Sequence, residues 1–410
     1  MIFRLLFTLF FISLIDIYAF QVFRTLAQTW PTWLRNATYT LYWAVPIILV
    51  VFMVAVNVSD TSQWNKTFYA FFRAILFITY FAKFLMGATM LLDDGRRAAL
   101  WGYRSLTSKE HVHRPDRSRF LAQFGLLLGA VPVGLMTYGI LRNQFRYQLL
   151  KHSLKITDLP KNLQGLRIVQ ISDIHSGTFT QKEPLRKAIE LINAAKPDLV
   201  FFTGDLVNNV ATEMVPYMDV FDKIESKHGV FSIFGNHDYG DYQPFDSPAE
   251  KVANLETLKG VHKKLGWNLL LNEHRNIEIN GEKVGIIGVE NYSALPQFPK
   301  YGDLDKAIVG MDEATSLRLL LSHDPTHWDS KVITEHQNID VTFSGHTHGF
   351  QFGIEIPGFF RWSPSQYMYP RWAGLYQAGK QYLYVNRGLG MLGYPGRVGI
   401  LPEVTIIDLV

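Results

Sequence analysis

Five short clusters in the second half of the chain combine carboxylate, amide and imidazole side chains, the groups that bind divalent metals. The clusters are Asp173-Ile174-His175, Gly204-Asp205, Gly235-Asn236-His237-Asp238, Ser322-His323 and Gly345-His346-Thr347-His348. Because imidazole nitrogens contribute so many of the donors, the set suits Mn, Fe or Zn and not a purely oxygen-ligated Mg or Ca site. Together the clusters predict the ligand set of a two-metal hydrolase.

Each cluster follows a short apolar run rich in β-branched and aromatic residues, a composition that predicts a β-strand. The eight runs of this kind lie at residues 166–172, 198–203, 230–234, 283–289, 317–322, 339–344, 382–386 and 403–409. Helices are expected between several of them, most clearly at 184–195 and 249–264, which favours an α/β domain. Since ligands bind at the carboxyl ends of strands in such domains, we expect the clusters to meet at one sheet edge.

The first 142 residues are typical of a membrane region. Apolar segments near the length needed to cross a bilayer lie at 5–23, 40–58, 68–92 and 121–141. The first is too long for a signal peptide and lacks a small-residue cleavage site, so we expect it to be retained. Asp16, Arg73 and Lys83 lie in or near the spans, where a charge must face protein or reach the membrane surface.

We therefore expect about four transmembrane helices in residues 1–142, a linker at 143–154 and a catalytic domain at 155–410. Residues 1–142 hold 14 Lys and Arg against 6 Asp and Glu, whereas residues 143–410 hold 26 against 30. The basic excess thus lies in the apolar half, which argues against nucleic acid as a partner. With no cysteine, the chain has neither disulfides nor thiolate metal sites.

Basic residues between the expected spans predict the orientation of a multi-pass cell-membrane protein. The segment 93–120 carries seven and the first loop carries two: Arg96, Arg97, Arg104, Lys109, Arg114, Arg117, Arg119, and Arg24 and Arg35. The positive-inside rule places these loops in the cytoplasm and the catalytic domain outside it. Four basic residues after the last span oppose this orientation: Arg142, Arg146, Lys151 and Lys155.

In their order along the chain, the clusters resemble the motifs of the calcineurin-like metallophosphoesterases. The matching motifs are Asp173-x-His175, Gly204-Asp205, Gly235-Asn236-His237-Asp238, His323 and Gly345-His346-x-His348. The closing Val385-Asn386-Arg387-Gly388-Leu389-Gly390 and Pro402-Glu403 segments are similar to the membrane-anchored branch of that family. The resemblance implies a four-layer α-β-β-α sandwich, preceded by an all-α transmembrane region.

The resemblance also implies two divalent ions, Mn, Fe or Zn, with overlapping ligand sets. One metal is expected on Asp173, His175, Asp205 and His348, and the other on Asp205, Asn236, His323 and His346. A hydroxide activated by both metals is the expected nucleophile. His237 is expected to contact the phosphoryl group or protonate the leaving oxygen, while Asp238 orients its ring.

The substrate is less closely defined by the sequence. Phe350, Arg387 and Arg397 are candidates for substrate binding, and the aromatic segment 350–376 either admits a lipid-linked phosphate at the bilayer interface or packs over the sheet. We expect a phosphoester or pyrophosphate of a phosphorylated or nucleotide-linked lipid. Relatives suggest UDP-2,3-diacylglucosamine pyrophosphatase activity in lipid A biosynthesis, which an extracytoplasmic site would argue against. A non-catalytic scaffold of the same fold is the alternative of a different class.

Overall fold

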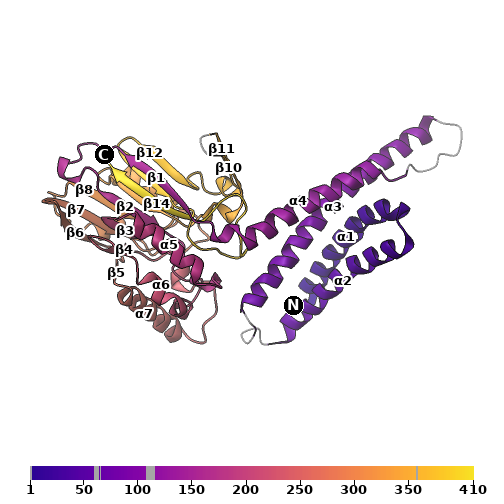
Figure 1. Ribbon diagram of the computed structural model, residues 1–410, viewed down its shortest axis with the longest axis horizontal. Coiled ribbons are helices and arrows are strands. Elements are labelled where there is room, and N and C mark those ends of the chain that lie inside the picture. Colours follow the sequence, from indigo (N-terminus) through magenta and orange to yellow (C-terminus); the bar gives the residue numbers. More distant parts are fainter. Residues whose placement is uncertain (1, 60–63, 65, 108–115, 357–358) are drawn as a thin grey trace. The chain divides into compact units, whose positions relative to one another are not determined.

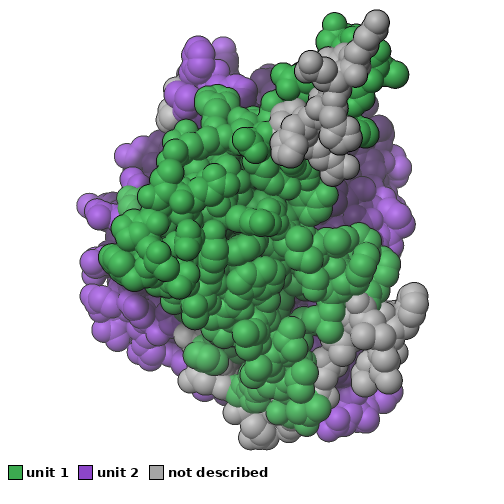
Figure 2. Space-filling model, turned by 90° about the vertical axis from the view of Figure 1, so that its right-hand side faces the viewer, with its two compact units in different colours: residues 1–138 green, residues 139–410 purple. Residues whose placement is uncertain are grey.

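The computed structural model describes residues 2–59, 64, 66–107, 116–356 and 359–410 (Figure 1). The chain divides into two compact units, residues 1–138 and 139–410, which Figure 2 colours green and purple. The second unit contains all five of the metal-type clusters.

Long apolar helices make up the first unit. They are α1 (Ile2–Leu26), α2 (Thr32–Val58), α3 (Lys66–Thr107) and most of α4 (Arg119–Leu141). All four helices are long and apolar enough to cross a membrane, as the sequence predicts. Helix α3 continues to Thr107, through part of the segment expected to be a basic loop, and Lys109 and Arg114 of that loop lie outside the described residues.

Two of the charges expected within the spans form a buried ion pair. Lys83 Nζ on α3 lies 2.6 Å from Asp16 Oδ1 on α1, and both side chains are almost fully buried. Tyr80 donates to Asp16 Oδ2 at 3.2 Å, and Tyr42 donates to the Asp16 carbonyl at 2.6 Å. The pair therefore links three helices while keeping both charges away from lipid.

Substituting only one partner of this pair is expected to be strongly destabilising. Asp16→Asn leaves the Lys83 ammonium buried without its carboxylate, which costs about 3 to 5 kcal/mol. The Asp16→Asn/Lys83→Met double variant removes both charges and should recover most of that loss. The free energy of unfolding, measured by SDS titration in mixed micelles, checks the prediction. A double variant as unstable as Asp16→Asn would contradict it.

Two six-stranded sheets form the centre of the second unit. The first has the order β1-β14-β2-β3-β4-β5 and the second the order β12-β13-β9-β8-β7-β6. The first sheet comprises β1 (Gln148–Leu154), β2 (Arg167–Ile171), β3 (Leu199–Phe202), β4 (Val230–Ser232), β5 (Trp267–Leu269) and β14 (Glu403–Leu409). The second comprises β6 (Glu273–Ile279), β7 (Glu282–Gly288), β8 (Leu317–Leu321), β9 (Val341–Ser344), β12 (Gly374–Ala378) and β13 (Gln381–Val385). A separate hairpin consists of β10 (Ile354–Ile356) and β11 (Phe360–Trp362).

Three apolar cores hold the layers together. The core between the sheets includes Phe201 of β3 and Phe343 of β9, whose ring centroids are 4.9 Å apart. A second core joins the first sheet to α5 (Glu183–Ala194), α6 (Met218–Phe221) and α7 (Pro248–Lys264), which Figure 1 shows beside it. The third joins the second sheet to α8 (Leu304–Ala307) and Trp328. The unit is therefore the four-layer α-β-β-α sandwich expected from the sequence.

All eight expected strands and both expected helices are present, with small shifts at their ends. The expected linker at 143–154 is wrong in part, because residues 148–154 form β1 at the edge of the first sheet. Strand β1 pairs in parallel with β14 from Gln148↔Glu403 to Leu154↔Leu409. Its pairing partner is more than 250 residues away in sequence, so no local pattern indicates that this segment belongs to the sheet.

Candidate dimetal site

The carboxyl ends of parallel strands from both sheets converge on one site. Strands β2, β3 and β4 are parallel in the first sheet, and β8 and β9 are parallel in the second. Direct hydrogen bonds join these strand ends across the sheets. His323 Nδ1 lies 2.7 Å from the Thr203 carbonyl, and Gln170 Nε2 donates to the Ser344 carbonyl at 2.9 Å. The clusters thus meet at the shared edge of two sheets and not at the edge of one.

The first group of donor atoms consists of Asp173, His175 and His348, all buried. His175 Nε2 and His348 Nε2 are 3.0 Å apart, and His348 Nε2 lies 3.3 Å from Asp173 Oδ1. His175 Nε2 is also 3.4 Å from Asp205 Oδ2. This geometry matches the ligand set expected for one metal, with Asp205 at its edge.

The second group contains Asp205, His323 and His346, with Asn236 beside them. His323 Nε2 lies 3.2 Å from the same Asp205 Oδ2 atom. Asn236 Oδ1 is 2.8 Å from His346 Nδ1 and 3.2 Å from His323 Nε2. The structure therefore brings together all seven expected ligands and places Asp205 between the two groups.

A left-handed backbone turn follows the strands that carry the donors. Five of the expected ligands have positive φ: Asp173, His175, Asp205, His346 and His348. Such angles are uncommon outside glycine and cost about 1 to 3 kcal/mol each, so they persist only where the surrounding structure enforces them. The turns direct alternate residues toward the donor atoms: Asp173 and His175 both enter the first group, while His346 and His348 enter one group each.

Close approach of the loops explains two of the glycines in the motifs. A Cβ atom on Gly235 would clash with the Asp205 carboxylate, and one on Gly345 would clash with Ser172 and the Asp173 carboxylate. Larger side chains at either position would push the two carboxylates out of place.

Burial determines the protonation of the donors. It lowers the pKa of His175 to about 3 and the pKa of His346 to about 4, so both rings are neutral, the form that binds metal. Burial raises the pKa of Asp173 to about 6, and the neighbouring carboxylate of Asp205 adds to the effect. A divalent cation among these groups favours the ionised carboxylates, because it offsets the charge that burial disfavours.

The donors fit a pair of divalent metal ions. Carboxylate oxygens and imidazole nitrogens lie within hydrogen-bond distance of one another in a buried position. Burial lowers the pKa of His175, His346 and His348, so that each neutral ring can offer a lone pair to a cation, while, against the effect of burial, the Asp205 carboxylate raises the pKa of His323 to about 10. Imidazole donors make Mn, Fe or Zn more suitable than Mg or Ca.

His237 lies beside the donors with one ring nitrogen occupied. His237 Nδ1 is 2.8 Å from the Asn208 carbonyl, so that nitrogen carries the proton in the neutral ring and Nε2 is the free atom. The His237 ring packs on Tyr242 and His175, at centroid distances of 4.5 and 5.0 Å. The ring is thus held in place from three directions.

The expected role of Asp238 is wrong, because its carboxylate does not orient the His237 ring. It is fully buried and accepts hydrogen bonds from the backbone N–H groups of Asp205, Leu206 and Gly235, each at 2.8 Å. Asp238 therefore positions the turn that carries Asp205, while the Asn208 carbonyl orients His237.

The two arginines expected to bind substrate have structural roles instead. Arg397 is fully buried, and its guanidinium donates to the carbonyls of Arg387, Gly388 and Gly390. Arg387 is also buried and forms ion pairs with Glu403 and Glu355, both at 2.5 Å. These contacts engage the Nη atoms of both guanidiniums, and neither arginine is among the residues that line the cavity beside the donors.

Phe350 lies where a substrate contact is expected. It lines a cavity of about 320 Å³ together with the donors Asp205, Asn236, His346 and His348. The remaining lining residues include His237 and a largely apolar group: Phe298, Met368, Tyr369 and Leu392. The cavity therefore has a polar floor and an apolar wall.

Three residues that contact the site were not assigned to it from the sequence, although Tyr369 lies in the aromatic segment 350–376. Tyr369 Oη lies 2.8 Å from His346 Nε2, and Tyr242 accepts a hydrogen bond from Asn236 Nδ2 at 2.8 Å. Asn208 presents its carbonyl to His237. The tyrosines lie in loops without a strand-end motif, and Asn208 acts through its backbone, so residue type alone does not identify these contacts.

Comparison with known proteins assigns the class that the fold and site define. The family model "Calcineurin-like phosphoesterase" matches residues 166–350, and "Probable Calcineurin-like phosphoesterase, transmembrane domain" matches residues 2–144. The chain is 30% identical over 293 residues to the uncharacterized metallophosphoesterase YkuE of Bacillus subtilis, covering 69% of this chain and 94% of YkuE. The chain belongs to the calcineurin-like metallophosphoesterases, hydrolases of phosphoric esters, and carries a transmembrane region.

Two other relatives are similar in sequence over about two thirds of this chain. A transmembrane protein with metallophosphoesterase domain from Danio rerio is 27% identical over 282 residues, which cover 67% of this chain and 60% of that protein. Phosphodiesterase YaeI of Escherichia coli is 28% identical over 267 residues, covering 64% of this chain and 88% of YaeI.

Removing the metals is expected to destabilise the second unit. When the free ion concentration is 100 times the dissociation constant, binding stabilises the folded state by about 3 kcal/mol. For a unit of this size, that corresponds to a rise in Tm of roughly 5 to 10 °C. Thermal melting of the full chain in detergent, followed by tryptophan fluorescence before and after chelation, measures the shift. Added Mn²⁺ should restore the Tm and added Mg²⁺ should not. An unchanged Tm in protein shown by elemental analysis to be metal-free would contradict the site.

Proposed function

We propose that this protein is a membrane-anchored phosphohydrolase that cleaves a phosphoester or pyrophosphate bond of a lipid-linked substrate. The observation that carries the proposal is the cavity beside the donors, whose floor is polar and whose wall is formed by Phe298, Phe350, Met368 and Leu392. A phosphoryl group fits the floor, and an apolar chain next to it fits the wall. The transmembrane region supports a substrate that resides in the bilayer.

The residues around the floor have distinct tasks in such a reaction. Asp173, His175, Asp205 and His348 would hold one metal, and Asp205, Asn236, His323 and His346 the other. When bound, the metal pair lowers the pKa of water and neutralises charge on phosphoryl oxygens. Tyr242 fixes the Asn236 amide so that its oxygen, and not its nitrogen, faces His323 and His346.

His237 is the group placed to act on the leaving oxygen. With Nδ1 bonded to the Asn208 carbonyl, its Nε2 is the atom able to donate a proton when the ring is protonated. His237 also lines the cavity with Asn236 and Asp205, so it lies beside the position of a phosphoryl group on the floor. Donation from Nε2 to the departing oxygen would avoid a strongly basic alkoxide.

The orientation in the membrane bears on which lipid is cleaved. The basic residues between the helices favour an extracytoplasmic catalytic unit, and such a unit would meet exported lipids. The alternative substrate, UDP-2,3-diacylglucosamine, is nucleotide-linked and requires a cytoplasmic site. A reporter fused after Val410 separates the two: a periplasm-active reporter supports exported lipids, and a cytoplasm-active one supports the nucleotide-linked precursor.

Matched substrates test the preference for lipid. Purified full-length protein in mixed micelles, supplied with Mn²⁺, would be assayed with phosphatidylglycerol against glycerophosphoglycerol and with phosphatidate against glycerol phosphate. We expect kcat/KM to be at least about tenfold higher for the acylated member of the pair that is cleaved, since one extra buried apolar segment contributes more than 1.4 kcal/mol. Equal values for the acylated and deacylated members would refute a lipid preference.

A further inference from the structure

The β10–β11 hairpin contacts the rest of the second unit through its charged pair, on what we call the inner face, while most side chains of its apolar outer face are exposed. Its strands pair antiparallel, with Glu355 opposite Arg361 on one face and with Ile354–Trp362 and Ile356–Phe360 pairs on the other. In a hairpin that packs on a water-soluble domain, the apolar face normally lies inward and the polar face meets water. In this hairpin the charged pair makes the contacts with the domain, while Ile354, Ile356 and Phe360 are exposed.

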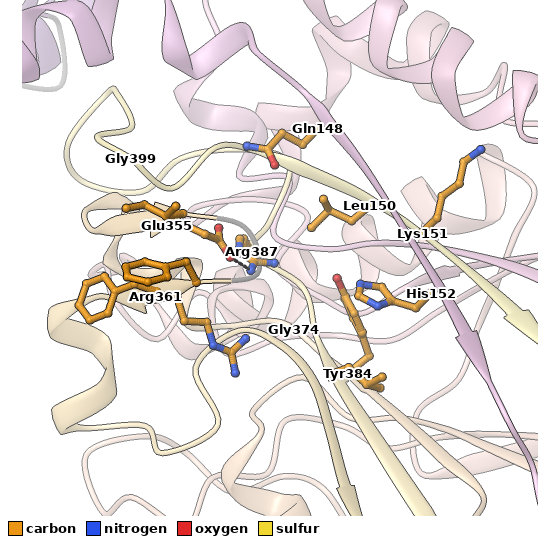
Figure 3. A pocket seen from close by; sticks show the side chains of 14 residues that line it. Gln148, Leu150, Lys151, His152, Glu355, Arg361, Gly374, Tyr384, Arg387 and Gly399 are labelled. Carbon is orange, nitrogen blue, oxygen red and sulfur yellow. Dashed lines mark hydrogen bonds and ion pairs between the residues drawn. The ribbon is translucent and has the colours of Figure 1, made fainter.

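Contacts of the inner face fix that arrangement. Glu355 is ion-paired with Arg387, and Arg361 Nη1 donates to the Ala373 carbonyl at 2.8 Å. The Arg361 guanidinium also lies over the Tyr376 ring, 5.4 Å from its centroid. Figure 3 shows Glu355, Arg361 and Arg387 beside a cavity of about 550 Å³, which Ile356, Phe359 and Phe360 also line. Because both charged side chains are engaged with the domain, the hairpin cannot turn over without breaking these contacts.

Three of the four apolar side chains on the outer face are exposed, and the fourth, Trp362, is half-buried. Ile356 and Phe360 each retain 49% of their accessible surface, and Phe359 at the end of the hairpin retains 86%. Ile354 is also exposed. Large apolar side chains gathered in this way mark an interaction site, since leaving them in water is unfavourable.

The apolar surface continues to the dimetal cavity. Phe352, Tyr367 and Met368 are exposed, and so is Phe350. Phe350 and Met368 also line the cavity that contains the metal donors. The outer face of the hairpin and the mouth of this cavity are therefore parts of one surface, which we define as the hairpin surface: Phe350, Phe352, Ile354, Ile356, Phe359, Phe360, Tyr367 and Met368.

The last residues of α4 belong to the same unit as the hairpin. Residues from Gly139 onward belong to the second unit, and the Arg397 N–H donates to the Gly139 carbonyl at 3.3 Å. The next residue, Val398, forms a β-bridge with Phe352, at the start of the hairpin surface. Since the candidate span Arg119–Phe145 includes Gly139, these contacts within the second unit connect the last residues of the span to the start of the hairpin surface.

We propose that the hairpin surface docks into the interfacial layer of the bilayer that α4 crosses, and that it thereby holds the mouth of the dimetal cavity at the membrane. Apolar and aromatic side chains are favoured at that depth. Docking would let a lipid phosphoester reach the donors while its chains remain in the bilayer. This consequence for substrate entry rests on the proposed function, whereas docking itself does not.

The absence of native cysteine permits a direct test in the full-length protein. Phe359→Cys and, as the control, Val309→Cys would each be labelled with a bimane fluorophore and reconstituted into nanodiscs with and without lipids that carry a nitroxide near the headgroup. Val309 is 75% exposed and belongs to the same unit but not to the hairpin surface. We expect the nitroxide lipids to quench the label at position 359 at least threefold more than the label at position 309.

Equal quenching at the two positions, or none at either, would overturn docking. A second label at Phe360→Cys provides an independent reading from the outer face, in case Phe359→Cys fails to fold, and should show the same excess over Val309→Cys. Because quenching requires no turnover, strong quenching together with equal rates on acylated and deacylated substrates would keep docking and reject the lipid preference. Equal or absent quenching together with faster cleavage of the acylated substrate would reject docking and keep the lipid preference.

Discussion

Asp205→Asn is expected to lower kcat/KM by about 10³-fold or more and to reduce the bound metal below two ions per chain. The reason is geometric: Asp205 Oδ2 lies 3.4 Å from His175 Nε2 and 3.2 Å from His323 Nε2, so one carboxylate serves both donor groups. An asparagine amide offers a single neutral oxygen and cannot hold two cations. Asparagine also tolerates the left-handed φ of 61° at this position, so the turn should persist.

The control for this variant is Asp340→Asn. Asp340 also accepts a backbone hydrogen bond, from Arg318 N at 2.7 Å, but belongs to neither donor group. Elemental analysis and hydrolysis of bis(p-nitrophenyl) phosphate would be measured on both variants. Asp340→Asn should keep two metal ions and most of its activity. If Asp205→Asn kept two ions and a rate near that of the parent, the shared-carboxylate site would be rejected.

His237→Gln is expected to lower kcat by about 10²- to 10³-fold while leaving the metal content unchanged, as for loss of a general acid. His237 lines the cavity, but its Nδ1 is bonded to the Asn208 carbonyl and it belongs to neither donor group. The loss should be larger for an alkyl phosphoester than for a nitrophenyl one, because nitrophenolate departs without protonation.

The matched control for this variant is His274→Gln. His274 Nδ1 makes the same type of contact, 2.7 Å from the Ala307 carbonyl, but does not line the cavity. We expect His274→Gln to retain the parent kcat on both leaving groups. An equal loss on alkyl and nitrophenyl substrates in His237→Gln would indicate that His237 binds the phosphoryl group and does not donate a proton.

Residue types and their order along the chain predicted which polar side chains the structure gathers into the two candidate donor groups. Carboxylates and imidazoles placed directly after apolar runs are informative because a strand end is a local feature, encoded by a few consecutive residues. The same reasoning located β2, β3, β4, β8 and β9, while the length of the apolar segments located the membrane-crossing helices. Strand β1 was missed because its membership of the sheet depends on distant β14, and the hairpin because its strands are very short.

Tertiary structure decided what the remaining polar side chains do. Asp238 and Arg397 were assigned from the sequence to catalysis and to substrate binding. In the structure, Asp238 accepts hydrogen bonds from the Asp205 turn, and Arg397 donates to three backbone carbonyls. Burial and partner choice depend on segments far away in the chain, which a local pattern does not contain. The same is true of Asn208, whose backbone carbonyl and not its side chain orients His237.

By itself, the sequence predicted the candidate donor set, because metal chemistry restricts it to a few residue types at strand ends. Only the tertiary structure decided that these side chains come from the facing edges of two sheets, with Asp205 between the two groups, and that most apolar side chains of the β10–β11 hairpin stay exposed. The physical reason is that an alternating strand pattern defines two faces without saying which is buried. In the hairpin, the contacts of Glu355 with Arg387 and of Arg361 with the Ala373 carbonyl determine which face packs on the domain.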